Sequence, residues 1–397
     1  MTKTVKILFT WLICATVCAA AEIAPTTTAP SDTDVVNQVI TKFMQENQIQ
    51  GVAVELYIDG QPQHYYFGYA NTAKKTPVTK NTIFELGSLS KIMTSILLAQ
   101  EIDAAKVSID ASVREYLPNL SNEFDDVTLK NLATHTGGLE LFLPETVKTP
   151  QELNDFLAHY KFENFPDEKW TYSNISMGLL GMAMESATHQ TLNNLYKQRI
   201  LAPLRMQPIG MSVPKTLQAN YALGYDSDGK EAPPIAMSIL PAGGQVKASA
   251  SDMQHFLSAA IGLPGTPERI LYPMRLTQSV YVELPNAMMQ GLGWVIHPLD
   301  KNYINGLLTA ANAMDLGPID VVDMYKKPIY SGNMLIDKTG MTDGFRSYIA
   351  VIPNKKTGIV ILANKRIYSP AIVQAARQIL FTLNHISAET PQVTPVG

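Results

Sequence analysis

The chain has 397 residues, of which 46% are hydrophobic and 17% are charged, and its formal net charge is −4. This length and composition are those of a globular protein with a sizeable core, and they exclude a disordered chain. The slightly acidic balance gives no reason to expect a nucleic acid or an anionic membrane surface as a partner. The 7 histidines are scattered without a close cluster of metal-ligating residues, so we expect no metal and no other cofactor.

The N-terminal segment has the pattern of a secretory signal. Two lysines precede an apolar run over residues 7–17, and small residues close the run before a cleavage site expected at Ala20 or Ala21. The run is short for a transmembrane helix, so residues 1–21 predict a periplasmic protein without a stable membrane anchor. Both cysteines of the chain lie in this segment, so we expect a mature protein without a disulfide or a thiol nucleophile.

The residues that follow predict a tail, a helix and a hairpin. Residues 22–33, rich in Thr, Ala and Pro, are expected to form a flexible tail. Apolar residues then recur at helical spacing over 34–48. Strands are expected at 52–58 and 64–69, joined by a turn at Asp59-Gly60.

The rest of the chain has helical patterns in the middle and strand patterns near the end, and this order predicts the fold class. A second helix is expected to begin near Ser88, and strands and a final helix are expected near the end, at 334–337, 348–352, 359–362 and 371–383. The region between reads as helical patches joined by loops. We therefore predict an α/β (α+β) fold, with one antiparallel sheet flanked by helices and a mostly helical part inserted into it. The catalytic domain would span 34–390, its α/β part about 34–100 and 290–390, and its helical part about 101–289.

The first motif with chemical meaning is Ser88-Leu89-Ser90-Lys91. If Ser88 opens a helix, Lys91 lies one turn further on the same face, within reach of the serine hydroxyl. A serine hydroxyl becomes a nucleophile when a neighbouring base takes its proton, and a lysine whose pKa is lowered can assist.

The second motif is Tyr172-Ser173-Asn174, just before an apolar run. A tyrosine hydroxyl between two lysines can carry a proton back and forth, because both cations favour the phenolate. The amide of Asn174 can hold both a lysine and a substrate carbonyl.

The third motif is Lys338-Thr339-Gly340, in which Lys338 supplies positive charge and Gly340 lets a ligand approach the strand. Lys356-Thr357-Gly358 has the same letters, but its position after a Pro-Asn pair predicts a hairpin turn instead. Ser-x-x-Lys and Lys-Thr-Gly in this order are typical of serine enzymes that recognise penicillins.

Longer stretches carry a resemblance to the class C β-lactamases. These stretches are Phe84 to Lys91, Gln290 to Trp294, and Lys338 to Lys365, and the similarity runs from about residue 34 to 385. The resemblance implies an α/β domain beside a helical domain, with the site in the cleft between them. It implies a β-lactam as the substrate and, in our interpretation, a monomer.

The resemblance assigns roles to individual residues. Ser88 would be the acylated nucleophile, Lys91 its activating partner, and Tyr172 the acid/base of acylation and deacylation. Asn174, Lys338, Thr339 and Gly340 would line the substrate site. The oxyanion hole would use the backbone N–H groups of Ser88 and Met341. Whether Lys91 or Tyr172 takes the proton stays open at this point.

Several residues depart from the class C pattern. Phe142 stands where the family usually has Gln, Gly244 where it has a Tyr, and Ser369 and Ile372 where it has Asn and Arg. These changes affect groups that would contact the substrate, so they concern specificity. Arg346, close to the third motif, is our candidate for a substitute anchor of the substrate carboxylate. Arg366 is the other arginine nearby.

Three other functions fit the same scaffold. A D-alanyl-D-alanine carboxypeptidase would use the same residues, an esterase often has another residue in place of Lys338, and a binding or sensor protein would have lost part of the catalytic set. His135, in Thr134-His135-Thr136, belongs to a triplet that resembles a structural loop of the family. We therefore expect a structural role for it and not a catalytic one.

Overall fold

The structure is a computed structural model that describes residues 31–207, 209–309 and 316–387. The expected signal segment, 1–21, and residues 22–30 of the expected tail lie outside the described residues. Within the described ranges, no helix is both long enough and apolar enough to cross a bilayer.

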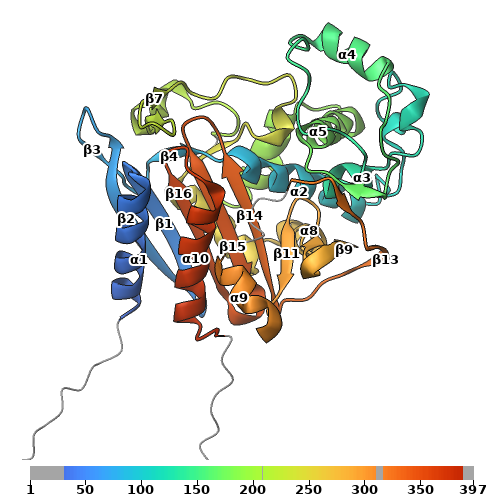
Figure 1. The fold of residues 1–397 in the computed structure, drawn as a ribbon. Helices are drawn as coiled ribbons and strands as arrows, with labels where there is room; N and C mark the ends of the chain where they lie inside the picture. Colours follow the sequence, from blue (N-terminus) through green and yellow to red (C-terminus); the bar gives the residue numbers. More distant parts are fainter. Residues whose placement is uncertain (1–30, 208, 310–315, 388–397) are drawn as a thin grey trace, which may run out of the picture.

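The fold is built on a ten-stranded antiparallel sheet with the order β13-β9-β10-β11-β14-β15-β16-β1-β2-β3. It brings together segments from the two ends of the chain, because β1 pairs with both β2 and β16 (Figure 1). The strands are β1 Gly51–Ile58, β2 Gln61–Asn71, β3 Thr76–Pro77, β9 Val280–Glu283, β10 Met289–Gln290, β11 Val295–Pro298, β13 Asp323–Ile329, β14 Met334–Met341, β15 Arg346–Ile352 and β16 Thr357–Ala363.

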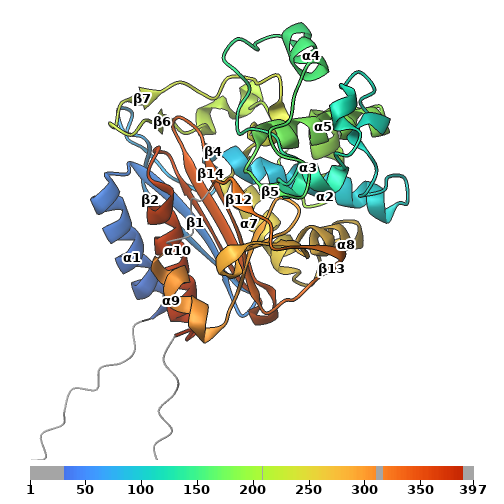
Figure 2. The same cartoon turned by 45° about the vertical axis from the view of Figure 1, so that its right-hand side comes forward.

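Helices cover both faces of this sheet (Figure 2). One face packs against α1 Asp32–Asn47, α9 Lys301–Thr309 and α10 Ser369–Leu383, and the other against α7 Ala250–Ile261 and α8 Glu268–Thr277. The strand β16 shows why its sequence is apolar without a break. Its side chains at 359, 361 and 363 enter the core on the α10 side, and those at 360 and 362 enter the core on the α7 side.

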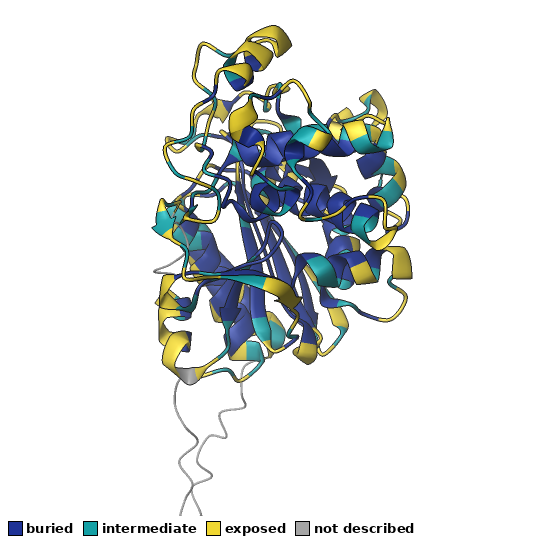
Figure 3. Cartoon of the chain, turned by 90° about the vertical axis from the view of Figure 1, so that its right-hand side faces the viewer, coloured by how far each residue is buried: buried dark blue, intermediate teal, exposed yellow. Residues whose placement is uncertain are grey.

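The remaining helices form the helical part beside the end of the sheet. They are α3 Leu129–Thr134, α4 Pro150–Ala158, α5 Asn174–Thr188 and α6 Leu192–Leu195, with a short two-stranded sheet of β5 Lys169–Trp170 and β12 Ile319–Asp320. The helix α2, Ser90–Asp103, contacts both α8 and α5 and is buried on nearly all sides. Figure 3 shows buried residues along the sheet and the helices packed on it, and exposed residues on the outer helices and loops.

The predicted fold class is confirmed, with three strands and a final helix near the C-terminus and a hairpin near the N-terminus. Asp59 and Gly60 both have positive φ, as expected for the hairpin turn. Lys356 lies in the turn between β15 and β16, so the second Lys-Thr-Gly is not part of the site. The helix α1 begins inside the expected tail, because Ser31 caps it by accepting a hydrogen bond from the backbone N–H of Asp34 at 3.2 Å.

The expected helical part, 101–289, extends too far. The helix α7 contacts β1, β15 and β16, and β9 and β10 belong to the large sheet. The sheet and its covering helices therefore include α7, α8, β9 and β10, which lie inside the expected helical part. Helical periodicity cannot show whether a helix packs on a sheet or on other helices, and this is why the sequence placed the boundary wrongly.

Candidate active site

Ser88 lies at the tight turn that enters α2. The turn η1, Gly87–Leu89, is a 3₁₀ helix that continues into α2, and Ser88 is half-buried in it. Gly87 has φ +52°, and a Cβ there would lie 2.5 Å from the backbone N of Met341. Only glycine allows this approach. The nucleophile turn therefore rests directly on the end of β14, next to the backbone N–H groups expected to form the oxyanion hole.

Lys91 is fully buried one turn further along α2. Its Nζ donates hydrogen bonds to the Ser88 Oγ at 3.1 Å, the Asn174 Oδ1 at 2.6 Å and the Gly243 carbonyl at 2.6 Å. Burial lowers the pKa of Lys91; the negative charge of an ionised Tyr172 opposes this effect, and the positive charge of Lys338 adds to it. The three acceptors use all three N–H bonds of an ammonium group.

Tyr172 lies beside both lysines. The Nζ atoms of Lys338 and Lys91 lie 4.8 and 4.9 Å from the centroid of its ring. Its hydroxyl is enclosed and has no hydrogen-bond partner within the described ranges that meets ordinary geometry. Burial by itself raises the pKa of Tyr172, but the charges of Lys338 and Lys91 outweigh it and lower the pKa to about 7. The two lysines therefore favour the phenolate form of this tyrosine.

Lys338 reaches this place because of strand alternation in β14. Ile336 packs into the core on the α7 side, and Lys338, two residues on, points to the same side of the sheet. Asp337 points to the opposite face, where it accepts a hydrogen bond from Arg377 of α10 at 2.6 Å. Lys338 is itself buried, and its Nζ donates to the Thr339 carbonyl at 3.0 Å.

Because Gly340 has no side chain, the nucleophile turn can pack directly against β14. A Cβ at this position would lie 2.1 Å from the Leu86 carbonyl, so no side chain fits. Ser347, on the neighbouring strand, donates to the same carbonyl at 2.7 Å. Thr339 and Met341 line the cavity beside it, and Met341 is exposed.

Asn174 begins α5, whose N-cap is Ser173. The Gly243 carbonyl accepts a hydrogen bond from the Lys91 Nζ, as Asn174 does, but it was not predicted from the sequence. It lies in the turn η6, Pro241–Gly243, which packs against α5 where Gly178 and Gly181 have no side chain. The Gly-x-x-Gly spacing on one helix face was the only signal in the sequence for this close approach.

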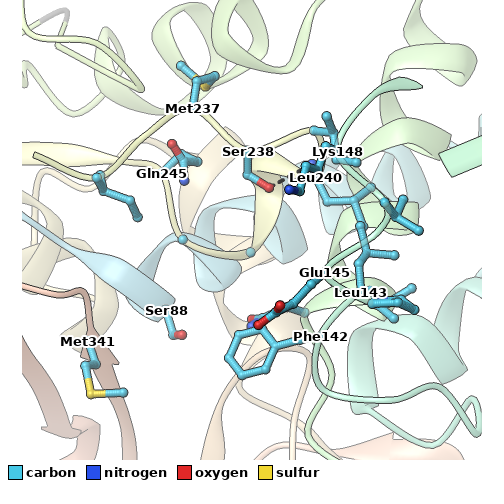
Figure 4. Close-up of a pocket in the computed structure, with 18 residues that line it drawn as sticks. Ser88, Phe142, Leu143, Glu145, Lys148, Met237, Ser238, Leu240, Gln245 and Met341 are labelled. Carbon is cyan, nitrogen blue, oxygen red and sulfur yellow. Dashed lines mark hydrogen bonds between the residues drawn. The ribbon is translucent and has the colours of Figure 1, made fainter. Parts of the chain in front are cut away.

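Two cavities meet at Ser88. One has a volume of about 540 Å³ and is bounded by the loops around residues 142–148 and 235–245, and the other has about 350 Å³ and contains Tyr172 and Lys338. Phe142, Asn174 and Met341 line both cavities. Figure 4 shows Ser88 and the Phe142 ring facing the larger cavity, with Met341 on the side of β14. Phe142 is 66% exposed, which is unusual for a large apolar side chain.

Arg346 lines the smaller cavity but is only 4% exposed. Its guanidinium donates to the Ile367 carbonyl through Nε at 2.9 Å and through Nη2, to the Ser369 Oγ at 2.6 Å, and to the Met341 sulfur at 2.9 Å. These contacts use four of its five N–H bonds. Burial lowers the pKa of Arg346 to about 10, and the neighbouring charge of Arg366 contributes. One N–H bond is left for a ligand.

The structure thus brings Ser88, Lys91, Tyr172, Asn174 and Lys338 together, along with the strand residues 339–341. Arg346 adjoins them but is mostly engaged by the protein. Within the described ranges, no group of three or more His, Cys, Asp or Glu side chains is placed to hold a metal ion.

Comparison with known proteins identifies the family of this site. The family model described as "Beta-lactamase" matches residues 36–383. A β-lactamase of Yersinia enterocolitica is 32% identical over 357 residues, which cover 88% of this chain and 91% of that protein. A class C β-lactamase solved with cefoxitin has a TM-score of 0.83 at 33% identity, covering 88% of this chain and 98% of that one. A D-alanine carboxypeptidase of Burkholderia cenocepacia has a TM-score of 0.81 at 30% identity, with 88% and 99% covered.

The chain is therefore a serine enzyme of the penicillin-recognising fold. It belongs to the β-lactamase family, and within that family to class C.

Proposed function

We propose that this enzyme opens the β-lactam ring of penicillins and cephalosporins through an acyl-enzyme on Ser88 and then hydrolyses that intermediate. The observation that carries the proposal is the position of Tyr172, a tyrosine with a pKa of about 7 beside the nucleophile and two lysines. A base with a pKa near the working pH is what general-base catalysis requires.

In the acylation step, the Ser88 Oγ attacks the lactam carbonyl carbon and the Tyr172 phenolate takes the hydroxyl proton. Lys91 already donates to the Ser88 Oγ and, as an ammonium, has no free pair with which to accept that proton. The carbonyl oxygen becomes an oxyanion, and the backbone N–H groups of Ser88 and Met341 are its proposed donors. When the C–N bond breaks, Tyr172 returns the proton to the ring nitrogen.

The deacylation step repeats this sequence with water. Tyr172, again as phenolate, takes a proton from a water molecule that attacks the ester carbonyl. It then protonates the Ser88 Oγ as the ester bond breaks. Lys338 and Lys91 keep the phenolate available in both steps, because each lies within 5 Å of its ring.

The substrate carboxylate would be held at the smaller cavity. Lys338 and Thr339 line this cavity, and Arg346 offers its remaining N–H bond. Asn174 would contact the amide carbonyl of the acyl side chain in the larger cavity, where its side chain is part of the lining. We propose further that the chain is secreted to the periplasm, as the segment 1–21 indicates, and that it acts as a monomer.

A D-alanyl-D-alanine carboxypeptidase is the second candidate, because the D-alanine carboxypeptidase of Burkholderia cenocepacia has nearly the same fold. The two functions differ in the fate of the acyl-enzyme after β-lactam attack. A β-lactamase hydrolyses it quickly, whereas a carboxypeptidase releases it slowly.

The experiment is to mix the purified mature protein with nitrocefin and to follow both ring opening and protein mass. Continuous turnover without a lasting mass increase supports the β-lactamase. One equivalent of ring opening with a persistent adduct on Ser88, together with release of D-alanine from an acyl-D-alanyl-D-alanine peptide, supports the carboxypeptidase. No reaction and no adduct would contradict both.

A further inference from the structure

His135 is bound to the residues on both sides of Tyr172. It follows α3 as a left-handed C-cap with φ +64° and is buried. Its carbonyl accepts the backbone N–H of Thr171 at 2.9 Å, and its ring Nδ1 accepts the backbone N–H of Ser173 at 3.3 Å. The backbone on each side of Tyr172 is thus held by one residue.

The His135 ring also packs against the Tyr172 ring. The two centroids lie 4.6 Å apart with a 45° tilt, and Trp170 meets the His135 ring edge-on at 6.1 Å. The Tyr172 N–H is fixed separately by the Leu316 carbonyl at 2.9 Å. The tyrosine ring therefore has a rigid wall on the side of His135.

The protonation state of His135 follows from these contacts. An N–H bond cannot point at the Ser173 N–H, so Nδ1 carries no proton and the ring is neutral with its proton on Nε2. Burial lowers the pKa of His135 well below its usual value, and the charges of Lys91 and Lys338 lower it further. Arg346 and Arg366 line the same cavity, whose described lining contains no Asp or Glu.

The His135 Nε2 is buried without a hydrogen-bond partner in the described part of the chain. Burying a donor in this way costs free energy, which an apolar ring of similar shape would avoid. An apolar ring, however, would leave the Ser173 N–H without its acceptor. The unpaired Nε2 is therefore tolerated, because only a ring with an acceptor at the Nδ1 position can also bind the backbone N–H beside Tyr172.

We propose that His135 is a positioning residue that holds Tyr172 against Lys91 and Lys338, acting as a neutral hydrogen-bond acceptor and a packing wall. The inference rests on the acid/base role of Tyr172 proposed above. Without His135, the tyrosine would move and water would enter between its ring and the lysines. Water would then screen the charges of the two lysines, so that they lower the pKa of its hydroxyl less.

The test uses two variants of His135 and one matched control. His135→Gly keeps the left-handed backbone without strain but removes the ring, and His135→Asn keeps an acceptor close to the Nδ1 position. His189 is also a left-handed C-cap, with φ +54° at the end of α5, but it is exposed and lies outside both cavities. His189→Gly therefore controls for the loss of a cap histidine.

The first readout is the ionisation of Tyr172, followed by ultraviolet difference titration against Tyr172→Phe. We expect a phenolate with a pKa of about 7 in the wild type, His135→Asn and His189→Gly, and a pKa shifted towards 10 in His135→Gly. The second readout is turnover. We expect kcat to fall about 10- to 100-fold in His135→Gly with KM nearly unchanged, and less than about threefold in the other two variants.

A wild-type titration in His135→Gly, or an equal loss in His135→Asn and His135→Gly, would overturn the proposal. So would the absence of a tyrosine that ionises near pH 7 in the wild type. If the wild type fails to turn over β-lactams but the titration behaves as expected, the proposed substrate is wrong and the role of His135 stands.

Discussion

The Lys91 Nζ donates a hydrogen bond to the Ser88 Oγ at 3.1 Å, so the nucleophile oxygen accepts from the lysine one turn further along the helix. As an ammonium, Lys91 has no lone pair with which to accept the hydroxyl proton. The proposed base is therefore Tyr172, whose ring centroid lies within 5 Å of the Nζ atoms of both Lys91 and Lys338.

We expect Ser88→Ala to reduce β-lactam turnover by about three or more orders of magnitude, because the nucleophile is lost. The fold should remain, since Ser88 is only half-buried and contributes little to the core. Steady-state kinetics with thermal unfolding of the same variant checks both statements. A β-lactam adduct found by mass on any residue other than Ser88 would disprove the assignment.

The Tyr172 pKa predicts a specific dependence on pH. The rate of acylation should rise as the pH rises through about 7, because the phenolate is the base. Stability should follow as well. The pKa of Tyr172 is lower in the folded protein than its value of 10.0 in the unfolded chain. Its contribution to the unfolding free energy therefore grows as the pH rises between these two values. Relative to Tyr172→Phe, the wild type should thus gain stability from about pH 7 to 10. The measurement is denaturant unfolding of both proteins at several pH values in this range. If the unfolding free energy changes equally with pH in the two proteins, the lowered pKa is contradicted.

Arg346→Ala should lower kcat/KM for a free-acid cephalosporin about 10- to 100-fold, the effect of about 1.5–3 kcal/mol from one charged hydrogen bond. The loss should shrink for an analogue whose carboxylate is esterified. Arg366→Ala is the matched comparison, because its side chain is 47% exposed and paired with Asp343 at 3.4 Å. If neither variant changes kcat/KM, the carboxylate rests on Lys338 and Thr339.

Phe142→Gln should weaken selectivity for substrates with an aromatic acyl group. An exposed phenyl ring at the junction of the two cavities gains about 1.5–3 kcal/mol when an apolar group covers it. We therefore expect kcat/KM to fall about tenfold for an aromatic acyl penicillin, with a smaller change for the same nucleus bearing a free amine. Phe165→Gln is the control, since Phe165 is 73% exposed and lines neither cavity. Equal changes for both substrates would contradict this role.

The buried ion pair of Asp337 and Arg377 should determine the stability of the protein in acid. Asp337 accepts hydrogen bonds from Arg377 at 2.6 Å and from the Tyr348 hydroxyl at 2.5 Å. Burial by itself raises the pKa of Asp337, but Arg377 and the neighbouring groups lower it far below 3.8. This stabilisation is present above pH 3.8 and is lost as the pH falls towards the folded pKa.

Removing one partner of this pair leaves a buried charge. Arg377→Met should therefore cost about 3–5 kcal/mol of unfolding free energy, measured by urea denaturation at neutral pH. The double variant Asp337→Asn/Arg377→Met should recover part of that loss. If the loss of unfolding free energy in the double variant equals the sum of the losses in Asp337→Asn and Arg377→Met, the two residues are not coupled.

The residue types and the local spacing were readable from the sequence. The Ser-x-x-Lys spacing puts Lys91 one turn after Ser88, and alternation in a strand puts Lys338 and Asp337 on opposite faces. The hairpin at Asp59-Gly60 and the fold class follow from patterns of the same kind. Such features depend on neighbours a few residues apart, which the chain itself keeps close.

Other features depended on segments that meet only after folding. The Gly243 carbonyl on Lys91, the His135 contacts on both sides of Tyr172 and the partners of Arg346 all join residues that lie well apart in the sequence. The same holds for α7, which packs on the sheet although its periodicity is that of any amphipathic helix. Periodicity shows which face of an element is apolar, whereas the tertiary structure decides what that face meets. The pKa of Tyr172 is set in this way too, because it comes from burial and from two lysines on different elements.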